Sequence, residues 1–151
     1  AEQLLLMVSG VRLGRMNDRA IIDTLLQSDL AGLPQRPAWV DGSGLSRYNL
    51  FTPSDLVYIL KKMHDEFGFE KLKKILPGAG TGTLANYYIQ DSGYIYAKTG
   101  TLTGQVCLSG FLVSKKNKLL IFSVLVNNHQ GSAVAVRTEV SRFLHEVRER
   151  N

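Results

Sequence analysis

This sequence has little cysteine and no long apolar run, and each shortage limits what the protein can be. Cys107 is the only cysteine among the 151 residues, so no internal disulfide can form. We interpret it as a small apolar residue buried in a strand. No stretch approaches the roughly 20 apolar residues that a membrane helix needs. An acid, Glu2, stands where a signal peptide would be basic. These absences leave the cellular compartment open.

Charge is not strongly biased either. Eighteen Lys and Arg residues against thirteen Asp and Glu residues give a net charge of +5. The positive residues are scattered in short groups that suit solvated helix faces and turns, and no aromatic-plus-basic pattern accompanies them. We therefore expect no nucleic-acid partner. The histidines lie far apart without the spacing of metal ligands, so we expect no metal and no cofactor; they are His64, His129 and His145.

The apolar periodicity predicts helices, then an antiparallel meander, then a closing helix. This order is typical of the α+β class, with helices packed on a sheet, and 151 residues suffice for one domain. The helices are expected at residues 1–9, 18–30, 53–67, 69–75 and 132–148, and the strands at 94–98, 105–114 and 118–127. Residues 119–126 are apolar on both faces, which predicts a central strand covered by helices. Because the first residues resemble the middle of a helix, we expect the chain to be part of a longer protein.

The segment Ala97-Lys98-Thr99-Gly100-Thr101 is the most informative motif. A phosphate-binding loop is excluded, because Ser92 and Ala97 occupy the positions where that pattern requires glycine. The remaining interpretation is the Lys-Thr-Gly strand of penicillin-interacting serine enzymes. There a substrate peptide pairs with the strand edge, which glycine leaves open. Lysine supplies positive charge and the threonines supply hydroxyl donors for a carboxylate, while a backbone N–H near Thr101 can face the developing oxyanion.

Several segments, taken in order, resemble one family. They are Asp41-Gly42-Ser43-Gly44-Leu45-Ser46-Arg47, Leu76-Pro77, Gly82-Thr83-Leu84 and Ala97-Lys98-Thr99-Gly100-Thr101-Leu102. Together they are similar to class C low-molecular-weight penicillin-binding proteins, the D-alanyl-D-alanine carboxypeptidases and endopeptidases that cut peptidoglycan stem peptides. The resemblance covers essentially the whole chain. It implies a serine β-lactamase/transpeptidase-like fold, of which residues 1–151 would be the C-terminal portion.

The resemblance also implies a nucleophile that this chain lacks. The family's chemistry uses Ser-x-x-Lys and Ser-x-Asn besides Lys-Thr-Gly, and no serine here has Lys three residues on or Asn two residues on. We therefore expect the full-length protein to be a serine carboxypeptidase and this chain alone to be inactive. The missing N-terminal part, or a second copy in a homodimer, is the expected protein partner. Stem peptides and β-lactam antibiotics are the expected ligands, in the periplasm or another extracytoplasmic space.

Further site residues follow from the resemblance alone. It implies that Leu45 and Arg47 line the pocket for the substrate side chain, with Leu102 and Thr103 beside them. Arg47 suits a substrate carboxylate, because its planar fork binds such groups with two bonds. An equally weighted alternative is an arginine that braces its loop.

Two alternatives to the enzyme remain open. One is a non-catalytic module of the same fold that binds peptides or cell wall. The other is an unrelated α+β domain in which the motifs match by chance, although the ordered set of matches disfavours it. The serines at 43 and 46 do not have the spacing of a nucleophile elbow, so we interpret them as loop-bracing residues.

Overall fold

The computed structural model describes residues 1–151. The chain divides into two compact units, Ala1–Ile59 and Leu60–Asn151, and each has its own hydrophobic core. The prediction was that residues 1–151 form the C-terminal portion of one catalytic domain. The division into two units does not decide this, so it stays a prediction.

The first unit begins with the helices α1 (Glu2–Leu13) and α2 (Asp18–Gln27), which pack on each other. Their contact buries a small apolar core formed by Leu5, Ile21 and Ile22. The prediction that the first helix ends at residue 9 was wrong. An internal glycine costs a helix only about 1 kcal/mol relative to alanine, so α1 continues through Gly10. It ends where Gly14 takes a left-handed φ of 68°.

Helix α3 (Pro53–Phe67) begins as its sequence predicts. The Thr52 hydroxyl accepts a hydrogen bond from the Asp55 N–H at 3.2 Å, and the Asp55 carboxylate accepts one from the Thr52 N–H at 2.9 Å. This reciprocal pair is a capping box, which satisfies N–H groups that the first turn leaves unpaired. Helix α4 (Phe69–Ile75) follows directly after Gly68 and confirms the predicted range.

The second unit contains a sheet of three antiparallel strands, β1 (Ile95–Leu102), β2 (Gln105–Val113) and β3 (Leu119–Asn127). Thr103 and Gly104 form the first hairpin turn, and Gly104 takes the positive φ of 75° that the turn requires. The second turn, at residues 115–117, joins β2 to β3, between the two strands expected there. All three strands confirm the prediction, although β1 continues four residues beyond Lys98 because β2 pairs with it as far as Leu102.

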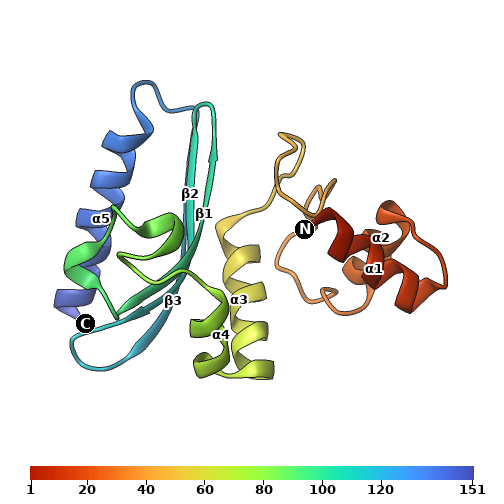
Figure 1. The fold of residues 1–151 in the computed structure, drawn as a ribbon, viewed down its shortest axis with the longest axis horizontal. Coiled ribbons are helices and arrows are strands. Elements are labelled where there is room, and N and C mark those ends of the chain that lie inside the picture. Colours follow the sequence, from red (N-terminus) through yellow and green to blue (C-terminus); the bar gives the residue numbers. More distant parts are fainter. The chain divides into compact units, whose positions relative to one another are not determined.

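Helices cover both faces of this sheet. Helix α5 (Ala133–Arg150) lies along one side of the strands, and α4 lies on the other (Figure 1). Val140 and Leu144 of α5 share a core with Ala97 and Leu108, whereas Leu72 of α4 packs with residues of the opposite face. The apolar residues on both faces of β3 are explained by this double cover. The predicted central position was wrong, however, because the strand order is β1-β2-β3 and β2 is central.

The segment between α4 and β1 contains two short 3-10 helices, η1 (Gly82–Leu84) and η2 (Ile89–Asp91). Asp91 is fully buried, and its carboxylate lies 3.0 Å from His145 Nδ1 and 3.6 Å from Arg148 Nη1, both on α5. This cluster ties the segment to the last helix.

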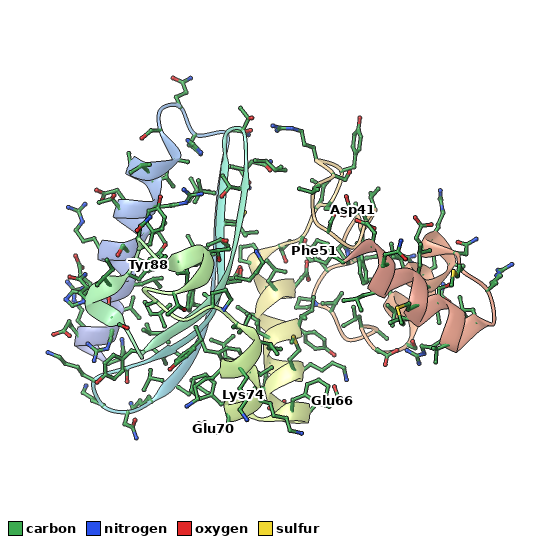
Figure 2. All side chains as sticks on the ribbon, viewed as in Figure 1. Asp41, Phe51, Glu66, Glu70, Lys74 and Tyr88 are labelled. Carbon is green, nitrogen blue, oxygen red and sulfur yellow. The ribbon has the colours of Figure 1, made fainter.

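Glu70 and Lys74 of α4 are exposed (Figure 2). No helix is both long enough and apolar enough to cross a membrane.

Candidate active site

The outer edge of β1 is covered over only part of its length. The Ala97 N–H donates to the Pro77 carbonyl at 3.0 Å, and the Ala79 N–H donates to the Ile95 carbonyl at 2.9 Å. These bonds place residues 77–79 beside the first half of the strand. From Lys98 onward, the second unit supplies no backbone partner for this edge.

The uncovered half of the edge presents backbone groups outward. In an antiparallel ladder, alternate residues direct both their N–H and their C=O to the same side. Since Ile95 and Ala97 bond outward, Thr99 and Thr101 also direct their N–H and C=O groups toward the open edge. The Lys98 ammonium already reaches it, because Nζ donates to the Thr99 carbonyl at 2.7 Å. This edge can therefore accept an extended peptide.

Side chains of the motif alternate between the two faces of the sheet. Thr99 and Thr101 lie on the face of Ala97, which α5 covers, and Lys98 and Gly100 lie on the opposite face. Lys98 and Thr101 are exposed. The strand ends at Leu102, which is half-buried, and Thr103 follows in the exposed turn. The structure thus brings six predicted site residues together along one strand end: Lys98, Thr99, Gly100, Thr101, Leu102 and Thr103.

Leu45 and Arg47 lie in a loop of the first unit, and both side chains are exposed. Asp41, labelled in Figure 2, organises the loop. Its carboxylate accepts hydrogen bonds from the N–H groups of Gly44 and Ser46, both at 2.7 Å, and from the Asn49 amide at 2.9 Å. Asp41 therefore braces this loop.

A second carboxylate holds the same loop, and the sequence did not reveal it. Glu2 accepts the Gly42 N–H at 3.1 Å and the Ser43 N–H at 2.8 Å. Hydrogen bonds from the Ser43 side chain and these N–H groups lower the pKa of Glu2. An acid at the start of a helix has an ordinary local role next to the helix dipole. No sequence signal therefore pointed to a partner about 40 residues away.

Arg137 of α5 is another residue that sequence reasoning missed. Its guanidinium donates to the Thr101 hydroxyl at 2.6 Å and to the Tyr87 hydroxyl at 3.2 Å. It also lies 5.1 Å from the centre of the Tyr87 ring. Burial raises the pKa of the neighbouring Tyr88 to about 12, although the positive charge of Arg137 opposes this shift. A lone arginine on an amphipathic helix carries no sequence signal for such a contact.

The structure contains no group of three or more His, Cys, Asp or Glu side chains placed to hold a metal ion. Cys107 pairs with Gly100 across the strands and is partly exposed, so the prediction that it is buried was wrong. Burial of the thiol still raises its pKa, which keeps it protonated at neutral pH.

Solved structures share this fold. A penicillin-binding protein 4 from Haemophilus influenzae, crystallised with a β-lactam, matches 99% of this chain with a TM-score of 0.82 and 24% identity. A predatory endopeptidase from Bdellovibrio bacteriovorus, acylated by penicillin G, matches 87% of it with a TM-score of 0.72 and 16% identity. The chain covers 37% and 39% of these structures, so it corresponds to part of a penicillin-binding-protein fold.

Sequence relatives carry related names. The chain is 36% identical to a D-alanyl-D-alanine carboxypeptidase from an Actinomadura species over 115 residues, which is 70% of this chain. It is 35% identical to a penicillin-sensitive carboxypeptidase A from Dictyostelium discoideum over 99 residues, which is 59% of it. The chain spans about a fifth of the length of these relatives. The model of the D-Ala-D-Ala carboxypeptidase 3 (S13) family matches residues 26–147, and the chain belongs to this family.

Proposed function

We propose that this chain is the C-terminal portion of the catalytic domain of a serine D-alanyl-D-alanine carboxypeptidase/endopeptidase. The full-length enzyme hydrolyses the terminal peptide bond of peptidoglycan stem peptides outside the cytoplasm. Family membership supports this function, because the matching relatives are named as carboxypeptidases. The nucleophilic serine comes from a part of the protein outside residues 1–151, since neither Ser-x-x-Lys nor Ser-x-Asn occurs here.

The observation that carries the proposal is the open half of the β1 edge. A substrate peptide adds to this edge as a further strand and bonds to the outward groups of Thr99 and Thr101. The Lys98 ammonium and the two threonine hydroxyls hold the substrate carboxylate. The Thr101 N–H stabilises the oxyanion that forms when the serine attacks the peptide carbonyl.

The loop of the first unit supplies specificity in this proposal. Leu45 and Arg47 contact the side chain of the stem peptide, and the arginine binds a carboxylate on it. In the second unit, Leu102 and Thr103, which follow the Lys98–Thr101 segment, are the proposed substrate-binding residues. The hydrogen bonds of Glu2 and Asp41 support this role, because they fix the backbone of the loop that carries both residues.

β-Lactams are the expected inhibitors. One solved relative is described in complex with a β-lactam, and one sequence relative is named penicillin-sensitive. A β-lactam carries a carboxylate next to its reactive carbonyl, as a D-Ala-D-Ala peptide does. We expect it to occupy the same β1 edge and to acylate the serine of the full-length protein.

Release of D-alanine from a synthetic peptide ending in D-Ala-D-Ala tests the proposal in the full-length protein. Lys98→Ala should lower kcat/KM about a hundredfold, the usual effect of removing one stabilising group from an active site. Lys118→Ala is the matched control, because Lys118 is exposed in the turn before β3, and it should leave the rate unchanged. Peptide binding without D-alanine release would favour the non-catalytic module.

A further inference from the structure

The contact between Arg137 and Thr101 joins α5 to the candidate substrate edge. Arg137 lies near the start of α5, and Thr101 lies near the end of β1. The two side chains are bonded at 2.6 Å. Tyr87 holds the guanidinium from a second direction, through its hydroxyl at 3.2 Å and its ring at 5.1 Å. The arginine is therefore fixed between the two hydroxyl groups.

This geometry determines the direction of the Thr101 hydroxyl. An arginine side chain can only donate hydrogen bonds, so the Thr101 oxygen must accept from it. The hydroxyl proton of Thr101 is then left to donate elsewhere. Because the Thr101 side chain is exposed beside the open half of β1, an acceptor bound at that edge can receive this proton.

The charge of Arg137 favours an anionic acceptor. Both hydrogen-bond partners of its guanidinium are neutral hydroxyls. The other arginines near the middle and end of α5 instead lie beside carboxylates: Arg142 pairs with Glu139, and Arg150 pairs with Glu146 at 3.2 Å. Positive charge at Arg137 thus remains available to a group that binds at Thr101.

We propose that Arg137 is a positioning residue that makes the β1 edge selective for peptides ending in a free carboxylate. It orients the Thr101 hydroxyl as a donor and adds positive charge behind it. The inference rests on the proposed carboxypeptidase function and deepens it, because it assigns the preference for a free C-terminus to a residue of α5. A merely structural Arg137 would affect charged and neutral substrates equally.

The test compares two peptides in the full-length protein, one ending in D-Ala-D-Ala with a free carboxylate and one with the same sequence ending in an amide. Arg137→Ala should lower kcat/KM for the carboxylate peptide about 10- to 100-fold, the range for a hydrogen bond that involves a charged group. The value for the amide peptide should change by less than about threefold, because no charged acceptor is present.

Two further variants keep the test interpretable. Arg137→Lys keeps the positive charge, but a single ammonium group cannot bond the Thr101 and Tyr87 hydroxyls in the same way. Compared with Arg137→Ala, it should therefore show a partial return of the preference for the carboxylate peptide. Arg142→Ala, on the same helix, should behave as the wild type.

Equal losses for the two peptides, or no loss for either, would overturn the inference while the carboxypeptidase function stands. If the wild type releases neither D-alanine from the carboxylate peptide nor D-alaninamide from the amide peptide, the proposed function is rejected, and the inference with it.

Discussion

Asp55 shows how one residue can be predicted locally and still do more than its local pattern indicates. The Thr52-Pro53-Ser54-Asp55 segment predicts the start of α3, and the capping box confirms it. The Asp55 carboxylate also accepts the Gln35 N–H at 3.0 Å, which the sequence could not reveal. Burial by itself would raise the pKa of Asp55, but these hydrogen bonds outweigh it and lower the pKa below its usual value of 3.8.

A carboxylate with a lowered pKa stabilises the folded state above its unfolded pKa, and this stabilisation is lost as the pH falls. We expect the urea midpoint of the protein to decrease below about pH 4. Asp55→Asn should reduce stability at pH 7 by about 1–3 kcal/mol and make this acid dependence shallower. Unfolding curves at pH 7 and pH 3 measure both effects.

The control for this prediction is Asp23→Asn. Asp23 is a surface acid whose nearest cation, Arg36, lies 3.7 Å away, so its loss should change stability little. An acid dependence that is the same in Asp55→Asn and in the wild type would contradict the assigned role.

The candidate site could be predicted at the residue scale only where its motif is continuous in the sequence. The Lys98–Thr101 segment is continuous, and the structure places it at an open strand edge. The contacts of Glu2 with Gly42 and of Arg137 with Thr101 join residues that are 40 and 36 positions apart in the sequence. In sequence, each looks like a charged residue on the solvent-exposed side of its own helix. Only the folded structure shows the contact.

At the scale of elements, the pairing of β1 with β2 depends on one glycine. A Cβ atom added at Gly110 would lie 2.2 Å from the Tyr96 carbonyl oxygen and 2.6 Å from the Ala97 Cα. Both atoms belong to the backbone of β1 and cannot move independently of the strand. The close approach of the two strands therefore requires glycine at this position.

Gly110→Ala should destabilise the protein by about 3 kcal/mol or more, because the clash must separate two paired strands. Gly100→Ala is the comparison in the same ladder, since its Cβ would meet only the Cys107 side chain, with the Cβ at 3.3 Å and the Sγ at 4.0 Å. Thermal unfolding of the two variants should rank Gly110→Ala as clearly less stable. Equal melting temperatures would show that the strands adjust to the extra carbon.

Most elements could be predicted from periodicity, and the exceptions have physical causes. Strands β2 and β3 are mainly apolar, interrupted near their middles by Ser109 and Ser123. Helices α3 and α4 are delimited by Pro53 and Gly68. The sequence pattern of residues 84–92 is ambiguous, and the structure there forms only the short 3-10 helices η1 and η2. Tertiary contacts of Leu84 and Asp91, both fully buried, decide that conformation rather than local propensity.

At the scale of the whole molecule, β3 is the unusual element. It is the second edge of the sheet, yet it consists almost entirely of apolar residues. An exposed edge strand of this kind carries unpaired N–H and C=O groups and readily pairs with another strand. The sequence predicted its apolar character but not its position, because strand order depends on which other strands are available.

We expect the isolated 151-residue chain to dimerise, to exchange strands between copies or to be marginally stable. Light scattering coupled to size-exclusion chromatography gives the mass in solution, and thermal unfolding gives the stability. Association should grow with protein concentration, since it depends on the free edge. A monodisperse monomer with a high melting temperature would contradict this prediction.

Our central proposal is that these 151 residues supply the Lys98–Thr101 strand of a penicillin-sensitive serine enzyme but not its nucleophile. The intact mass of the chain after incubation with a penicillin tests it most directly, with the full-length protein as the comparison. We expect no mass increase for the chain and a stoichiometric penicilloyl adduct on the full-length protein. An adduct on the chain would mean that one of its own serines, such as Ser43 or Ser46, is the nucleophile, and the account would be wrong.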